Sequence, residues 1–153
     1  MTEQKGGKRI PLIELDLIVG LISEEDTLHE IAKEIFTLIN SKQIKNISIP
    51  SSVFLEYELL LKSKKIETNE IVKDLVNFRE LNDIKEIPLT SSVLIHAFSL
   101  RNQYNLTYFD SLHCASALHV DGVIIGTDSD FDEISNLTLI SPTDFLKDHG
   151  VDF

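Results

Sequence analysis

The stretch TYFDSLHCASALHVDGVIIGTDSDFDEI, residues 107–134, decides the fold of this chain. Its first part, residues 107–120, is predicted to be a helix, and the apolar run GVIIG at 122–126 has the continuous hydrophobicity of a buried parallel strand. Three aspartates at every second position follow that strand: Asp128, Asp130 and Asp132. Because like charges at this spacing repel, something must neutralise them.

The rest of the chain repeats this alternation of strand and helix. The predicted strands are residues 10–15, 46–50, 85–89, 122–126 and 137–141. The predicted helices are residues 17–22, 26–41, 51–64, 68–82, 90–104, 107–120 and 142–148. Long helical connections between strands imply crossovers and a mostly parallel sheet covered on both faces. We therefore predict a three-layer α/β/α fold around a sheet of about five strands, in one domain at residues 10–149 after a flexible tail at 1–9.

Local signals mark where several of these helices begin. Thr27 and Glu30 have the spacing of a capping box. Ser51 or Ser52 is expected to cap the helix that follows Pro50. Pro142 suits the first turn of the last helix.

Composition narrows the classes of function. The chain has 153 residues, 42% of them hydrophobic, and a net charge of −11, which argues against a broad basic surface for nucleic acid. A nuclease that carries its own cations is less affected by this argument. The single cysteine, Cys114, excludes an internal disulfide and fits a reducing compartment, so we expect a cytoplasmic protein. The apolar stretch at 10–22 is interrupted by Glu14 and Asp16 and is too short to span a membrane.

Two aspartates follow predicted strands. Asp16 stands at the carboxyl end of the first strand and Asp128 just past the fourth. Ligands of open α/β sheets bind beyond the carboxyl ends of the strands, so both aspartates would face one crevice if these strands are neighbours. The alternative is that they are turn or capping residues, for which aspartate is common.

Glu56 lies inside the apolar stripe of its predicted helix. At ~100° per residue it falls between Leu59 and Leu60, whereas Glu58 falls at the edge of the stripe and can pair with Lys62. A carboxylate in an apolar stripe needs a cation, a partner or a raised pKa. Pairing with a distant lysine or arginine is the alternative to a role in a site.

Asp110 opens the helix at 107–120, where a helix N-terminus would stabilise an anionic side chain. Its capping-box spacing from Thr107 gives a purely structural alternative. His113 lies one turn further on, and a packed or surface role is expected for it. Glu14 is on the same face of the predicted strand as Asp16 and is an alternative ligand.

Four carboxylates from separate elements therefore converge in this interpretation, and Asp130 is a fifth candidate. The predicted set is Asp16, Glu56, Asp110, Asp128 and Asp130. Converging hard oxygen ligands indicate Mg²⁺ or Mn²⁺, and the absence of histidine and cysteine from these positions argues against zinc.

Residues 10–141 of the chain resemble the PIN-domain ribonucleases, the family that includes the VapC-type toxins. The resemblance rests on IELDLIVGLISEEDTLHEIA at 13–32, IPSSVFLEYELLL at 49–61 and, most specifically, the stretch at 107–134. It implies a parallel sheet between helices and an acidic pocket for Mg²⁺ or Mn²⁺. By resemblance, Asp16 matches the first acid of the family, Glu56 the second, Asp110 the third and Asp128 the fourth. Asp130 matches an additional acid that many members have. Phe131 then matches the aromatic residue that closes the family's turn.

The activity implied by this resemblance is that of a metal-dependent endoribonuclease, a hydrolase of RNA phosphodiester bonds. The resemblance also implies an RNA substrate, an antitoxin protein as partner if the chain is a toxin, and a homodimer. Asp16, Glu56, Asp110 and Asp128 would carry the catalysis.

Two departures from the family pattern leave alternatives open. Leu17 and Ile18 stand where the family usually has a small polar pair, and Gly126 stands where it often has serine or threonine. The alternative function is therefore a catalytically weak or inactive PIN-like module that acts through protein partners. A phosphatase using Asp128 and Asp130 is disfavoured, because that pair normally follows the first strand of its fold.

Overall fold

The structure, a computed structural model, describes residues 9–81 and 83–153. The predicted tail at 1–9 falls outside the described residues except for Arg9, and so does Asn82, the predicted end of one helix.

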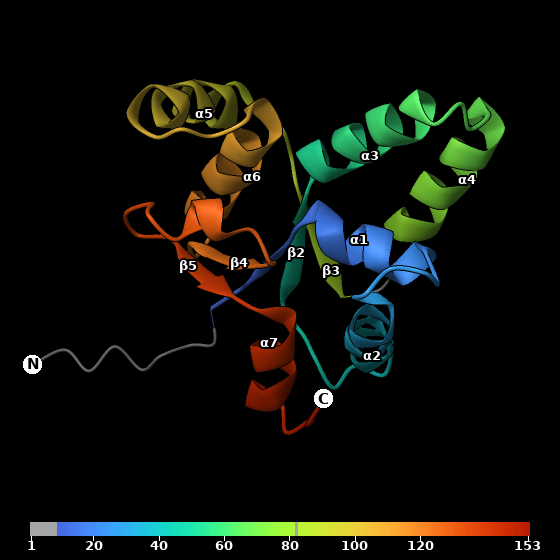
Figure 1. Ribbon diagram of the computed structural model, residues 1–153. Helices are drawn as coiled ribbons and strands as arrows, with labels where there is room; N and C mark the ends of the chain where they lie inside the picture. The colour runs from blue at the N-terminus through green and yellow to red at the C-terminus, as the bar shows by residue number, and fades with distance from the viewer. Residues whose placement is uncertain (1–8, 82) are drawn as a thin grey trace, which may run out of the picture.

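The centre of the molecule is a parallel five-stranded sheet (Figure 1). Its strands are β1 (Leu12–Ile13), β2 (Ile47–Pro50), β3 (Ile84–Ile87), β4 (Val123–Ile125) and β5 (Thr138–Ile140). The order across the sheet is β3-β2-β1-β4-β5, and every neighbouring pair is parallel. The predicted parallel sheet is confirmed, and β1 and β4 are neighbours, which brings their carboxyl ends together.

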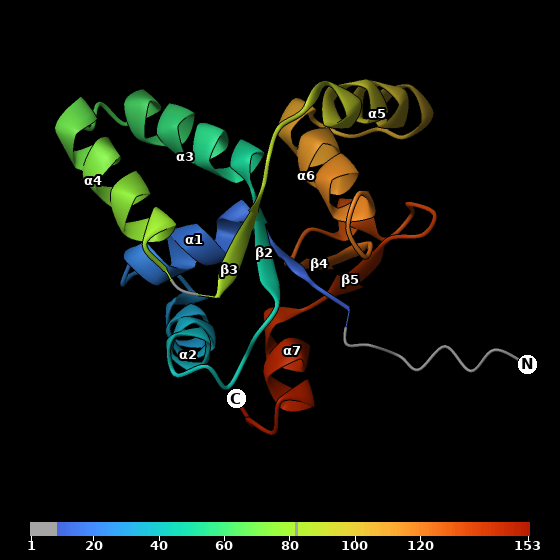
Figure 2. The same cartoon turned by 180° about the vertical axis from the view of Figure 1, so that it is seen from behind.

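Helices cover both faces of this sheet (Figures 1 and 2). They are α1 (Leu15–Ile22), α2 (His29–Asn40), α3 (Ser51–Ser63), α4 (Thr68–Arg79), α5 (Ser91–Gln103), α6 (Tyr108–Leu118) and α7 (Pro142–Asp148), with a 3-10 turn η1 (Ser129–Phe131). Each helix in the described part of the chain is too short or too polar to cross a lipid bilayer.

Two hydrophobic clusters form the core, one on each face of the sheet. Successive strand residues point to opposite faces. Ile13 and Ile125 accordingly belong to the cluster with residues of α1, α2, α3 and α7, whereas Leu12 and Ile124 belong to the cluster with α5 and α6. The three-layer α/β/α architecture predicted from the sequence is therefore confirmed.

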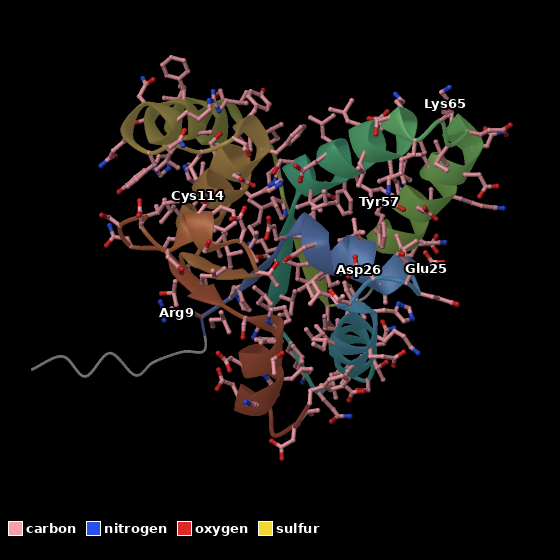
Figure 3. All side chains as sticks on the ribbon, viewed as in Figure 1. Arg9, Glu25, Asp26, Tyr57, Lys65 and Cys114 are labelled. Atoms are coloured by element: carbon pink, nitrogen blue, oxygen red, sulfur yellow. The ribbon has the colours of Figure 1, made fainter. Side chains whose placement is uncertain are left out.

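Two labelled side chains in Figure 3 illustrate how the helices are held. Tyr57 of α3 is 2% exposed, and its hydroxyl donates to the Asp74 carboxylate of α4 across 2.6 Å. Cys114 of α6 is fully buried in the core, and burial raises the pKa of its thiol to about 12. A thiol held neutral in this way is packed as an apolar side chain.

The first strand is shorter than predicted. It ends at Ile13, Glu14 follows with an extended backbone as the N-cap, and α1 already begins at Leu15. Asp16 therefore lies in the first turn of a helix and not on the strand. The apolar run was misleading because both the short strand and the buried side of α1 are hydrophobic, so that only the pairing with neighbouring strands separates them.

Two of the predicted helix caps are wrong. The helix α2 begins at His29 after Leu28, and the carboxylate of Asp26, not the Thr27 hydroxyl, accepts from a backbone amide in the preceding turn. Pro50 is the N-cap of α3, and the hydroxyls of the serines that follow it bond to groups on other elements. Long-range partners have displaced the local capping bonds in α3.

The other start signals are confirmed. The Thr107 hydroxyl accepts from the Asp110 amide at the start of α6, across 3.2 Å. Pro142 occupies the first turn of α7, where its missing N–H costs nothing.

Candidate functional site

Three carboxylates gather at the carboxyl end of the sheet. One oxygen each of Glu14, Asp110 and Asp128 lies within 4.8 Å of the others. Glu14 follows β1, Asp128 follows the neighbouring β4, and Asp110 lies in the first turn of α6. This is the edge at which open α/β sheets bind their ligands.

Glu14 reaches this group because it continues the strand. Its backbone is extended, with φ −94° and ψ 168°, so its side chain lies on the same face as that of Leu12, two residues earlier. That face is covered by α6, the helix that carries Asp110. Asp16, two positions further on, belongs to α1, which packs on the other face of the sheet. The alternation of side chains along a strand therefore does not apply to Asp16.

Glu14 is the acid most strongly perturbed in the group. It is 7% exposed, and its Oε2 is buried with no hydrogen-bond partner among the described residues. Burial is the main cause that raises its pKa to about 9, and the charges of Asp16, Asp110, Asp128 and Glu56 raise it further. A buried carboxylate oxygen without a donor calls for a proton or a cation.

The space for Glu14 exists because residue 126 is glycine. A Cβ at Gly126 would lie 2.5 Å from Glu14 Oε2, closer than a Cβ atom approaches a non-bonded atom. Serine or threonine, which the family often has here, would collide with the glutamate. The glycine is therefore explained by the volume of the buried acid and not by a backbone conformation.

Asp16 lies beside this group but is bound elsewhere. Its Oδ2 accepts from the amide (3.0 Å) and the hydroxyl (2.8 Å) of Thr127, and its Oδ1 accepts from the Leu17 amide at 2.8 Å. Burial raises the pKa of Asp16, against the opposing effect of these hydrogen bonds, and the charge of Asp128 raises it further. Asp16 thus ties α1 to the turn that presents Asp128.

Asp110 and Asp128 are partly buried. Burial raises the pKa of Asp110, the Thr107 hydroxyl opposes this rise, and the neighbouring charge of Asp128 adds to it. The backbone amide of Asp130 donates to Asp128 Oδ1 across 2.9 Å, and the fully buried Phe131 anchors the same turn. Phe131 therefore closes the turn, as its resemblance to the family aromatic implied.

The side chain of Asp130 is outside the group of three carboxylates. It is exposed and lines a different pocket, together with Tyr104, Asn105 and Glu133. Its contribution to the acidic group is the backbone amide that holds Asp128. The sequence indicated a fifth carboxylate there because it could not show which way this turn faces.

Glu56 is also outside the group, and its partner is neither lysine nor arginine. His113 Nε2 lies 3.0 Å from Glu56 Oε1, and the other ring nitrogen, Nδ1, lies 2.8 Å from Ser52 Oγ. His113 is completely buried, whereas the Glu56 side chain is 25% exposed. The sequence favoured a packed or surface role for His113, although its position one turn after Asp110 placed it within reach of the pocket.

The donor set of the acidic group fits a hard divalent cation. All three groups are carboxylates, one of them has a buried oxygen to which none of residues 9–81 and 83–153 donates, and no histidine or cysteine belongs to the group. Mg²⁺ and Mn²⁺ prefer such oxygen ligands. A bound cation would remove the repulsion among Glu14, Asp110 and Asp128.

Comparison with known proteins gives one family and several similar structures. The family model described as PIN domain matches residues 16–137. No curated protein matches the sequence significantly.

Three similar solved structures illustrate this match. VapBC2 of Rickettsia felis, bound to a DNA fragment from its promoter, has a TM-score of 0.63 at 19% identity, over 85% of this chain and 96% of that one. VapC20 of Mycobacterium tuberculosis, a toxin that cleaves the sarcin–ricin loop, has a TM-score of 0.62 at 14% identity, over 79% and 92%. A toxin–antitoxin complex of Klebsiella pneumoniae has a TM-score of 0.59 at 18% identity, over 86% and 97%. At these identities the likeness is one of fold.

Proposed function

The chain belongs to the PIN-domain family, a family of nucleases, and from this premise we propose that it is a divalent-metal-dependent endoribonuclease. The observation that carries the proposal is the group formed by Glu14, Asp110 and Asp128, with the buried Glu14 Oε2 that has no donor among the described residues. Mg²⁺ or Mn²⁺ is the cofactor to which this donor set is suited.

We propose Glu14 as the first acid of the site in place of Asp16. With this assignment the two positions that follow the first acid are Leu15 and Asp16, so that a polar side chain again stands in the pair where Leu17 and Ile18 had suggested none. The argument for a catalytically weak or inactive module then loses its main support. Asp16 acts through Thr127, whose amide and hydroxyl it holds next to Asp128.

The proposed reaction is hydrolysis of an RNA phosphodiester bond. A bound cation would lower the pKa of a water and neutralise charge on the phosphate. Glu14, Asp110 and Asp128 would hold the cation. The charge of Glu56 acts on Glu14 and Asp110, so Glu56 lies near this group, and its side chain is 25% exposed. Glu56 would accept the proton of the attacking water while the water oxygen bonds to phosphorus. The bond from phosphorus to the ester oxygen would break, and the leaving oxygen would take a proton from solvent.

Because the protein is acidic, the RNA backbone needs positively charged side chains near the site to bind. Lys62 lies six residues beyond Glu56 on α3, which is about 9 Å along a helix axis. It pairs with Glu58 across 2.7 Å, as the sequence predicted. Lys65 lies at the outer end of α3 (Figure 3). We propose that this end of α3 contacts the RNA backbone away from the cleaved bond.

The direct test is cleavage of bulk ribosomal and transfer RNA by the wild type and by Asp128→Asn. We expect cleavage with Mn²⁺, none with EDTA, and a loss of at least about 100-fold in the variant, because losing a metal ligand removes several kcal/mol of transition-state stabilisation. Asp130→Asn is the matched control and should retain activity, because its exposed side chain lies outside the group. A wild type that binds Mn²⁺ but cleaves no RNA would instead favour the inactive module.

We further propose an antitoxin as protein partner, so that the chain is the toxin of a toxin–antitoxin pair. The support is the likeness of fold to VapBC2 and to the other toxin–antitoxin complex. Co-expression with the product of an adjacent gene for a small DNA-binding protein, followed by an RNA-cleavage assay, tests this. Cleavage that such a partner leaves unchanged would speak against the toxin role.

A second copy of the chain is the partner we propose for the exposed face of α5. Ile95 is 72% exposed and Phe98 61% exposed, one turn apart on the helix, and adjacent apolar residues of this kind mark interaction surfaces. Light scattering should give twice the 17.3 kDa mass of one chain. Phe98→Glu should give the mass of a monomer, whereas Val72→Glu on α4, also exposed, should not. A monomeric wild type would overturn the proposal.

A further inference from the structure

A buried chain of two hydrogen bonds links α3 to α6 next to the acidic group. Ser52 and Glu56, four residues apart on α3, lie on either side of the imidazole of His113 on α6. The distances are 2.8 Å from Ser52 Oγ to Nδ1 and 3.0 Å from Nε2 to Glu56 Oε1. Ser52 and His113 are both 0% exposed, and only Glu56 reaches solvent.

The chemistry of these three side chains determines which atom donates in each of the two hydrogen bonds. An ionised carboxylate only accepts hydrogen bonds, so His113 Nε2 carries the hydrogen of this bond and its N–H donates to Glu56 Oε1. In the neutral ring Nδ1 is then an acceptor, and the Ser52 hydroxyl donates to it. Glu56 thereby selects the Nε2–H tautomer, and Ser52 reinforces it and fixes the plane of the ring by donating to Nδ1, as partners of metal-ligating and catalytic histidines commonly do.

A serine–histidine–glutamate order also occurs in hydrolases with a nucleophilic serine. Here the serine has no access to a substrate, because its side chain is fully buried between two helices. The only member of the chain that solvent reaches is the glutamate. The two hydrogen bonds therefore serve to position Glu56, and they do not activate Ser52.

We propose that His113 is a positioning residue that holds Glu56 at the edge of the acidic group, as the acceptor for the proton of the attacking water, and that Ser52 orients His113 for this purpose. The inference rests on the proposed nuclease function. The hydrogen bond keeps one carboxylate oxygen of Glu56 on the histidine, which accounts for its separation from the three carboxylates that lie within 4.8 Å of one another.

The first test needs neither metal nor RNA. Nitrogen-15 NMR of the histidine side chains in the metal-free protein should show His113 as the Nε2–H tautomer, with a ring proton that exchanges slowly. Ser52→Ala should speed this exchange or mix the tautomers. Ser116→Ala is the matched control, because that buried hydroxyl on α6 bonds to the Leu112 carbonyl and leaves the histidine alone. An Nδ1–H tautomer in the wild type would overturn the proposal.

The second test separates positioning from metal binding. His113→Leu, which keeps an apolar volume but has no donor, should lower kcat by about 10- to 100-fold and change the Kd for Mn²⁺ by less than about threefold. His113→Gln can still donate to Glu56 and should recover most of the lost kcat. Unchanged kcat in His113→Leu would overturn the proposal, as would an equal loss of Mn²⁺ affinity. A wild type without nuclease activity would refute the proposed function, and the NMR test would still decide whether His113 holds Glu56.

Discussion

Glu14→Gln is expected to weaken Mn²⁺ binding by at least about 100-fold, whereas Asp16→Asn is expected to weaken it by about tenfold or less. Both changes replace a carboxylate by an amide of the same shape. The difference arises because Glu14 places inside the group a buried oxygen to which no residue in the described part of the chain donates, whereas the oxygens of Asp16 already accept from Thr127 and Leu17. Isothermal calorimetry with each folded variant measures the difference.

The proton balance of this binding identifies the same residue. With a pKa of about 9, Glu14 holds a proton at pH 7 in the metal-free protein and must release it when a cation binds. The affinity of the wild type for Mn²⁺ should therefore rise with pH up to about 9. Calorimetry in two buffers of different ionisation heat should detect the released proton in the wild type and a smaller release in Glu14→Gln.

The same shift has a consequence for stability. Between the ordinary pKa of 4.5 and the folded value of about 9, the folded metal-free protein binds a proton that the unfolded chain does not. The free energy of unfolding should therefore fall as pH rises through this window, and less steeply in Glu14→Gln.

Normal Mn²⁺ binding by Glu14→Gln together with lost Mn²⁺ binding by Asp16→Asn would return the role of first acid to Asp16.

Gly126→Ser is expected to destabilise the protein by about 1–3 kcal/mol and to abolish Mn²⁺ binding at the same time. The new Cβ would lie 2.5 Å from Glu14 Oε2, so this buried oxygen would have to leave its present position among the three carboxylates. Urea unfolding measures the first effect and calorimetry the second.

Shortening the acid should relieve the collision. Glu14→Asp removes one methylene group, so the double variant Glu14→Asp with Gly126→Ser should regain stability and Mn²⁺ affinity relative to Gly126→Ser alone. The two changes would then be coupled in a double-mutant cycle, as expected for residues in contact. Additive effects would contradict the view that residue 126 is glycine because of the volume of Glu14.

The alternation of strands and helices could be read from the sequence because it depends on local patterns. The continuous apolar runs of buried strands and the long connections between them predicted the parallel sheet. Asp128 was recognised as a candidate because it stands just past the end of such a run, and Asp110 because it opens a helix. These signals involve neighbouring residues only, so no knowledge of packing was needed.

The first acid could not be read in the same way. The sequence favoured Asp16 because the apolar run hides the end of β1 at Ile13. Which of Glu14 and Asp16 points at Asp110 depends on that end, since the side chains of a strand alternate between its two faces. Only the pairing of Leu12 and Ile13 with β4 in the folded sheet sets it.

The sequence by itself therefore determined the fold class, the edge of the sheet at which carboxylates gather, and the hard-oxygen character of the candidate site. Only the tertiary structure decided that Glu14 joins the group, that Gly126 provides its space, and that His113 binds Glu56 from 57 positions away along the chain. The physical reason is that local periodicity encodes secondary structure, whereas contacts and volumes between distant residues arise only when the two faces of the sheet are packed.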